Sequence, residues 1–78
     1  MAQNLSIALS ALKNEVDGNT LAAIEVAYRE GLMLHPDCPL CSRLAAHRAI
    51  AKMLSSAYPA HPAAMKYVAI VNSVFNQK

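Results

Sequence analysis

Seven residues near the middle of the chain hold a histidine, two prolines and both cysteines, in the order His35-Pro36-Asp37-Cys38-Pro39-Leu40-Cys41. His35, Cys38 and Cys41 are three residues apart, and imidazole and thiolate are the ligands that structural zinc prefers. Such a site needs four ligands. His47 falls on another face of the helix expected after Cys41, and His61 follows the end of that helix, roughly 30 Å from Cys41. The sequence therefore predicts at most three zinc ligands from one chain, and the fourth would come from another chain or from water.

The same segment could instead carry thiol redox chemistry. Cys38-Pro39-Leu40-Cys41 has the Cys-Pro-x-Cys form of glutaredoxin-like active sites, and Cys38 is expected at a helix N-cap, where free amides and the helix dipole favour a thiolate. Thioredoxin-like folds place this motif after a β-strand, however, and nothing before Cys38 has a strand pattern. Redox chemistry at Cys38 and Cys41 is therefore one alternative. The other is a helix start whose two cysteines stay reduced and only pack.

Basic residues are concentrated in the second half of the chain. Residues 1–37 carry two basic and five acidic side chains, a net charge of −3, whereas residues 38–78 carry five basic ones and no acidic one, +5. Arg43, Arg48 and Lys52 are candidates for binding an anion such as a nucleic-acid phosphate. Arg43 and Arg48 lie about 140° apart on a helical wheel, and the pI of 8.7 is low for a nucleic-acid-binding domain. The pattern therefore disfavours nucleic acid as the partner.

Apolar residues recur with the period of α-helices along the whole chain. Gly18 is expected to end the first helix, and Asn19 or Thr20 to cap the second. Pro36 and Pro59 are expected to end the second and third. The pattern predicts an all-α fold with four helices, over residues of about 5–17, 20–34, 39–57 and 62–76. We expect one domain, residues 1–78, folded as an antiparallel four-helix bundle.

One stretch of the second predicted helix resembles part of a known repeat. Residues 24–37 are similar to the second helix of a tetratricopeptide repeat at Tyr28, Gly31, Leu32, Leu34 and Pro36. The resemblance covers about half of one repeat, and a solenoid needs about three repeats. It therefore implies a helix that ends at a proline turn and no function. Gly31 inside this helix suggests that a neighbouring helix passes close to it.

The composition predicts self-association. The chain is 55% hydrophobic and 15% charged, which is more apolar than a monomer of 78 residues needs. The fourth predicted helix is apolar over more than half of its circumference, so one side of it should be covered by a sister subunit. The expected interface residues are Tyr67, Ile70, Val71, Val74 and Phe75.

The sequence thus favours a binding function over catalysis. It contains no nucleophile–base–acid set, no Gly-rich phosphate loop and no paired catalytic carboxylates. We expect that the protein is not an enzyme and has no catalytic residue. The one cofactor that the sequence allows is zinc, at His35, Cys38 and Cys41. No apolar run is long enough to span a membrane, and the first residues lack the basic start of a signal peptide. The expected protein is a small cytoplasmic interaction or regulatory module, a homodimer that binds itself or a second protein.

Overall fold

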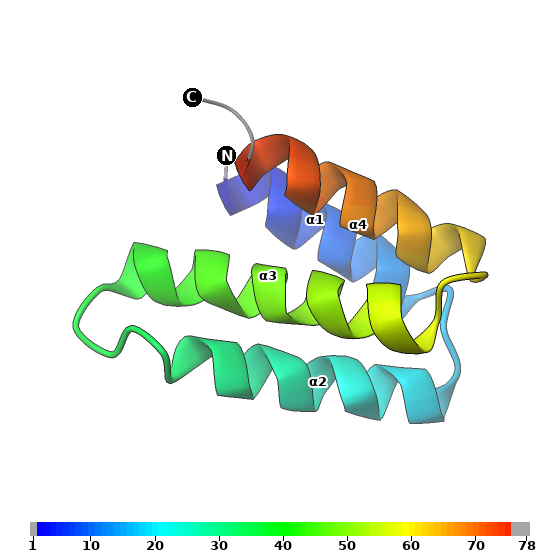
Figure 1. The fold of residues 1–78 in the computed structure, drawn as a ribbon, viewed down its shortest axis with the longest axis horizontal. Coiled ribbons are helices and arrows are strands. Elements are labelled where there is room, and N and C mark those ends of the chain that lie inside the picture. Colours follow the sequence, from blue (N-terminus) through cyan, green and yellow to red (C-terminus); the bar gives the residue numbers. More distant parts are fainter. Residues whose placement is uncertain (1, 76–78) are drawn as a thin grey trace.

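Four α-helices make up most of the chain (Figure 1). The computed structural model describes residues 2–75, with side chains from residue 5 onwards. The helices are α1 (Ala2–Lys13), α2 (Gly18–Leu32), α3 (Pro39–Ala57) and α4 (Pro62–Phe75), and the described residues contain no strand. The predicted all-α class is confirmed. No helix within residues 2–75 is both long and apolar enough to cross a membrane.

The bounds of α3 are those that its prolines predict. Cys38 is the N-cap, with extended backbone (φ −132°, ψ 102°), and Pro39 is the first helical residue, where no amide donor is lost. At the other end the Tyr58 amide donates to the Leu54 carbonyl oxygen over 2.8 Å. Pro59 cannot continue the helix, because it lacks an amide and disfavours helical backbone in the residue before it. α4 likewise begins at Pro62 as predicted, and residue 76, its predicted end, lies outside the described residues.

The boundary between α1 and α2 differs from the prediction. α1 ends at Lys13, four residues early, and Gly18 is the first residue of α2 and has no positive φ. The N-cap is Asp17, whose Oδ1 accepts a hydrogen bond from the Thr20 amide over 2.8 Å. A carboxylate satisfies a free amide and complements the positive end of the helix dipole. Asp17 therefore starts α2 before Asn19 or Thr20 can, and Gly18 is not needed to end α1.

α2 also ends early, at Leu32, just after its closest approach to α3. A Cβ added to Gly31 would lie 2.3 Å from the Cα of Ala46 and 2.9 Å from the carbonyl oxygen of Ala45. Only a residue without a side chain lets the two backbones come this close. The expectation that a helix passes close to Gly31 is confirmed, and that helix is α3.

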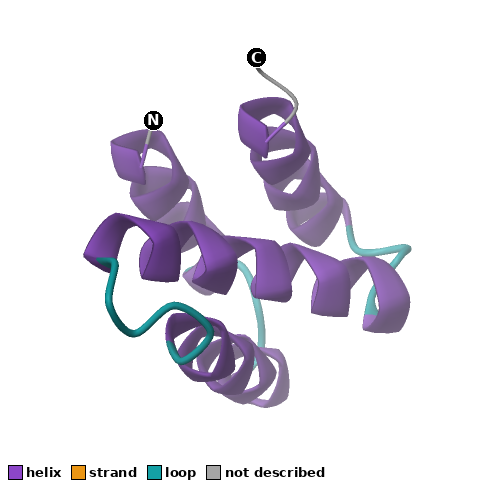
Figure 2. Cartoon of the chain, turned by 60° about the vertical axis from the view of Figure 1, so that its left-hand side comes forward, coloured by secondary structure: helices purple, strands orange, loops and turns teal. Residues whose placement is uncertain are grey.

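α3 is the central element of the fold. It contacts all three other helices, with α2 on one side and the α1–α4 pair on the other (Figures 1 and 2). Figure 2 shows α1 and α4 side by side, both crossing α3 at a steep angle. The described chain is compact, with extents of 33 × 25 × 20 Å. The structure thus confirms four helices in one compact unit, and the antiparallel bundle stays a prediction.

The core lies between α3 and its three neighbours. All four helices contribute fully or almost fully buried side chains, with exposed fractions below a tenth: Leu5, Leu9, Leu12, Ile24, Ala27, Ile50, Ala51, Leu54, Ala64, Tyr67, Val68 and Val71. Among residues with described side chains, the buried polar ones are Thr20, Ser42 and His47, and each comes from α2 or α3. The same central helix therefore carries the core and, at its N-terminus, the cysteine motif.

Candidate functional site

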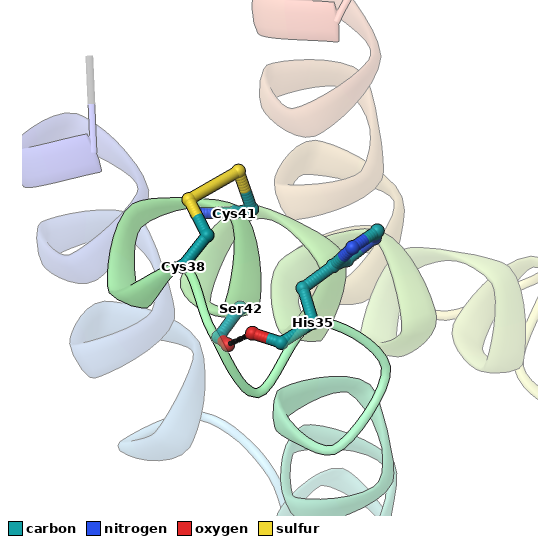
Figure 3. The surroundings of a disulfide bond; sticks show 4 residues. All are labelled: His35, Cys38, Cys41 and Ser42. Atoms are coloured by element: carbon teal, nitrogen blue, oxygen red, sulfur yellow. Dashed lines mark hydrogen bonds between the residues drawn. A yellow bond between two sulfur atoms is a disulfide. The ribbon is translucent and has the colours of Figure 1, made fainter.

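Cys38 and Cys41 form a disulfide across the first turn of α3 (Figure 3). Their Cα atoms are 5.2 Å apart, within the usual range for a disulfide. The extended backbone of Cys38 at the N-cap and the helical backbone that follows Pro39 bring the two residues to this distance. Cys41 is exposed and Cys38 is half-buried. The structure therefore differs from the expectation of two reduced thiols.

Hydrogen bonds hold the turn before α3 in one conformation. The Cys38 Sγ accepts a hydrogen bond from the Cys41 amide over 3.2 Å, as an N-cap side chain does. The Cys38 amide donates to the His35 carbonyl oxygen over 3.2 Å, and the buried Ser42 hydroxyl donates to the same oxygen (Figure 3). The bonded cysteine pair is thus presented by a fixed loop on the end of the longest helix.

The predicted zinc ligands do not form a ligand set as they are placed. Both sulfur atoms are used by the disulfide, whereas zinc binds deprotonated free cysteines. The imidazole of His35 lies apart from the two sulfur atoms (Figure 3). Among the residues that the structure describes, no three His, Cys, Asp or Glu side chains come together as possible metal ligands. Zinc at His35, Cys38 and Cys41 would need a reduced and rearranged turn.

Large apolar side chains are exposed on both sides of the disulfide. Met33 is 74% exposed and Leu34 67%, where α2 ends, and Leu40 is 57% exposed between the two cysteines. These are three of the five large apolar side chains that the described part of the chain exposes. Three exposed large apolar side chains within eight residues make this turn a candidate binding surface. Helical periodicity gave no sign of it, because these residues lie at the helix ends, where the period breaks.

A hollow runs from the disulfide along α3 toward the end of α4. We call it the Cys41 groove, and its walls include Leu34, His35, Cys41, Leu44, Arg48 and Phe75. Its apolar side chains come from the turn after α2, from α3 and from α4. The guanidinium carbon of Arg48 lies over the Phe75 ring, 5.5 Å from its centroid. The groove therefore combines apolar side chains with polar and charged ones, and Arg48 is held against the Phe75 ring in its wall.

Only part of the predicted anion-binding set lies at this groove. Arg48 and Lys52 are both exposed and line the groove, together with the acidic Glu30. Arg43 is exposed on α3 but is not among the lining residues. The three basic side chains therefore do not form a single cationic stripe, as the wheel spacing indicated.

His47 is part of a buried polar pair rather than of the cysteine turn. Its Nδ1 lies 2.6 Å from the hydroxyl oxygen of Tyr67, at hydrogen-bond distance, and its ring meets Tyr28 edge-on with centroids 5.9 Å apart. His47 and Tyr67 are each only 2% exposed. Burial lowers the pKa of His47 below its ordinary value and raises the pKa of Tyr67, to which the neighbouring Tyr28 also contributes. Both groups are therefore held neutral.

The predicted α4 interface divides into two groups. Tyr67 and Val71 lie in the chain's own core, with 2% and 1% exposed, so they offer a partner almost no surface, although Tyr67 reaches the floor of the hollow between α1 and α4. Ile70, Val74 and Phe75 are half-buried and keep apolar surface in reach of solvent. The reason is that α1 and α3 already cover the face of α4 that we had assigned to a sister subunit.

A second hollow lies between α1 and α4, and Ile70 lines it. The other lining residues include Ile7, Ala8, Ala11, Glu15, Ala63 and Lys66, and we call this surface the α1–α4 face. Ile7 is 69% exposed there, although it is a large apolar side chain.

Comparison with known proteins gives no relative from which to assign a role. No protein-family model matches the chain, and no curated protein or solved structure matches it.

Proposed function

We propose that this protein is a helical protein–protein interaction module that associates with a second copy of itself through the α1–α4 face. The single observation that carries the proposal is Ile7, 69% exposed on the wall of an apolar hollow that Ile70 also lines. Covering a side chain of this size contributes about 1.5–3 kcal/mol. The proposal moves the interface from Tyr67 and Val71 to the outer side of α4 and to α1.

Charge on the α1–α4 face favours a second copy as the partner. Glu15 and Lys66 both line the hollow, so its rim carries one acidic and one basic side chain around an apolar centre. In a twofold interface the same patch meets itself, and residue i of one copy contacts residue j of the other. A patch with one charge of each sign can therefore pair acid with base across the twofold axis.

The same arrangement would form a four-helix bundle between two chains, which differs from the antiparallel bundle of one chain's four helices that the sequence predicts. α1 and α4 lie side by side in each chain, and two such pairs packed face to face give four helices around a shared apolar seam (Figure 2). The partner would stabilise a chain that is short for independent folding. In this proposal the protein is a cytoplasmic binding or regulatory module and not an enzyme.

Native mass spectrometry of wild type and of Ile7→Asp tests the interface. We expect a dimer for the wild type and a monomer for Ile7→Asp, because a carboxylate in the apolar centre loses its hydration on association. Ile7 is exposed within one chain, so the variant should keep its helical circular dichroism spectrum. Val26→Asp is the matched control, since Val26 is 52% exposed on α2, outside this face, and should stay dimeric. A monomeric wild type at high concentration, or a dimeric Ile7→Asp, would overturn the proposal.

A further inference from the structure

We propose that Cys38 and Cys41 are a redox-active pair that exchanges its disulfide with a dithiol of another polypeptide bound in the Cys41 groove. The proposal does not depend on self-association, because the groove and the α1–α4 face have no residue in common among those that define them. In the cytoplasm, the compartment proposed above, a disulfide is usually transient, either catalytic or redox-sensing.

The sulfur of Cys41 is the one that an incoming thiolate reaches. Cys41 is exposed and lines the groove, whereas Cys38 is half-buried and does not line it. Access decides which sulfur of a disulfide is attacked. The mixed disulfide therefore forms on Cys41, next to the groove that holds the substrate.

The N-terminus of α3 makes Cys38 the better leaving group. Its Sγ already accepts a hydrogen bond from the Cys41 amide, over 3.2 Å. When the S–S bond breaks, the negative charge develops on this sulfur, at the positive end of the helix dipole and opposite a free backbone donor. A sulfur whose thiolate is stabilised leaves faster.

The exchange balances in two steps. A substrate thiolate attacks the Cys41 Sγ, a substrate–Cys41 bond forms, the Cys38–Cys41 bond breaks, and Cys38 leaves as a thiolate. The second substrate thiolate then attacks the substrate sulfur that is bonded to Cys41. This closes the substrate disulfide and releases Cys41 as a thiolate. The two protons of the substrate thiols pass to water or to the two cysteines. The substrate dithiol loses two electrons and the Cys38–Cys41 disulfide gains them.

The surroundings of the disulfide specify what kind of segment fits. Met33, Leu34 and Leu40 expose apolar surface around the turn, and Leu44 and Phe75 continue it along the groove. They favour a substrate whose cysteines have apolar neighbours. Arg48 and Lys52 in the groove wall outnumber the acidic Glu30, so the charged groups there favour an incoming thiolate. The partner is thus a polypeptide dithiol in an apolar segment, rather than a small hydrophilic thiol.

The test compares two synthetic peptides with oxidised full-length protein. Each peptide has two cysteines, flanked by leucines in one and by serines in the other, and mass spectrometry of acid-quenched samples follows the two hydrogens that the protein gains. We expect the leucine peptide to react faster. Leu34→Ser should slow its reaction about tenfold and leave the serine peptide unchanged, since one lost apolar anchor costs about 1–2 kcal/mol.

Two controls keep the test specific to the groove. Val26→Ser changes an exposed apolar residue on α2, the helix that precedes Leu34, outside the Cys41 groove, and should change neither rate. Cys38→Ser keeps an N-cap residue and removes the thiol that releases a bound peptide in the reverse exchange. A leucine peptide with a single cysteine, supplied as an activated disulfide, should therefore remain bound to Cys41 in the variant and be released from the wild type. Equal rates for the two peptides, an effect of Leu34→Ser on both, or no peptide on Cys41 would each overturn the proposal.

Discussion

The hydrogen bond between His47 and Tyr67 is the most deeply buried polar contact that the structure describes between side chains. Nδ1 and the hydroxyl oxygen are 2.6 Å apart, and the direction of the bond depends on the tautomer of the neutral imidazole. Every buried side-chain nitrogen and oxygen in the described residues has a hydrogen-bond partner. The pair therefore ties α3 to α4 without leaving an unsatisfied polar atom in the core.

Tyr67→Phe should lower the free energy of unfolding by about 1–3 kcal/mol, because Nδ1 of His47 then stays buried without its partner. Urea unfolding followed by circular dichroism measures the loss. Tyr28→Phe is the control: Tyr28 contacts His47 through its ring, edge-on, so losing its hydroxyl should cost less than about 1 kcal/mol. Equal losses in the two variants would mean that the His47–Tyr67 bond contributes nothing specific.

The buried imidazole also predicts how stability depends on pH. Burial lowers the pKa of His47 below 6.5, so below that pH the unfolded chain takes up a proton that the folded chain still excludes. Stability should therefore be fully present above about pH 6.5 and should fall as the pH drops through the range between the two pKa values. His47→Gln removes the titration, and its unfolding free energy should change less over that range. A parallel decline in both proteins would assign the effect to other groups.

The crossing of α2 and α3 sets how the first half of the fold meets the second. Gly31→Ala would place a Cβ 2.3 Å from the Cα of Ala46, on backbone that cannot move aside cheaply. Helix propensity alone would favour alanine by about 1 kcal/mol. We expect the clash to outweigh this gain, with a net loss of about 1–3 kcal/mol in thermal or urea unfolding.

Gly18→Ala is the matched variant at the start of the same helix. An added Cβ there meets nothing within 4 Å, and the backbone does not have positive φ. The substitution should stabilise the protein by about 0.4–1 kcal/mol, chiefly by restricting the unfolded chain. If both glycine variants were stabilised, α2 and α3 would not be as close as the structure has them.

The ends of a helix were predictable where a single residue, such as a proline, determines them. Pro39 and Pro59 fix the bounds of α3, because a missing amide has the same consequence in any fold. At the start of α2, Asn19 or Thr20 was the expected N-cap. Asp17 is the N-cap instead, because its carboxylate accepts a hydrogen bond from the Thr20 amide. The pattern predicted the cysteine turn as a helix start but not the Cys41 groove, whose walls come from three helices far apart in sequence.

The molecule as a whole has two proposed surfaces that share no lining residue, although α4 contributes to both. α3 is covered by α2 on one side and by α1 and α4 on the other (Figure 1). The apolar pattern of one helix therefore does not show which of its faces remain exposed to solvent. This is why Tyr67 and Val71 were assigned to a partner: the α4 pattern shows that both sides need cover, but not that α1 and α3 supply it. The exposure of Ile7 on α1 and of Leu34 after α2 could not be predicted either, because it depends on which faces the neighbouring helices leave uncovered.

Thermal unfolding at several protein concentrations tests whether the dimer is part of the folded state. A partner that binds only folded chains stabilises them by mass action, so the wild-type Tm should rise with protein concentration. Ile7→Asp should have a lower Tm that does not change with concentration, because the variant stays monomeric and the altered residue, 69% exposed, is not part of the monomer core. Circular dichroism melting curves measure both. A wild-type Tm independent of concentration would mean that one chain folds alone and that the exposed Ile7 serves a different partner.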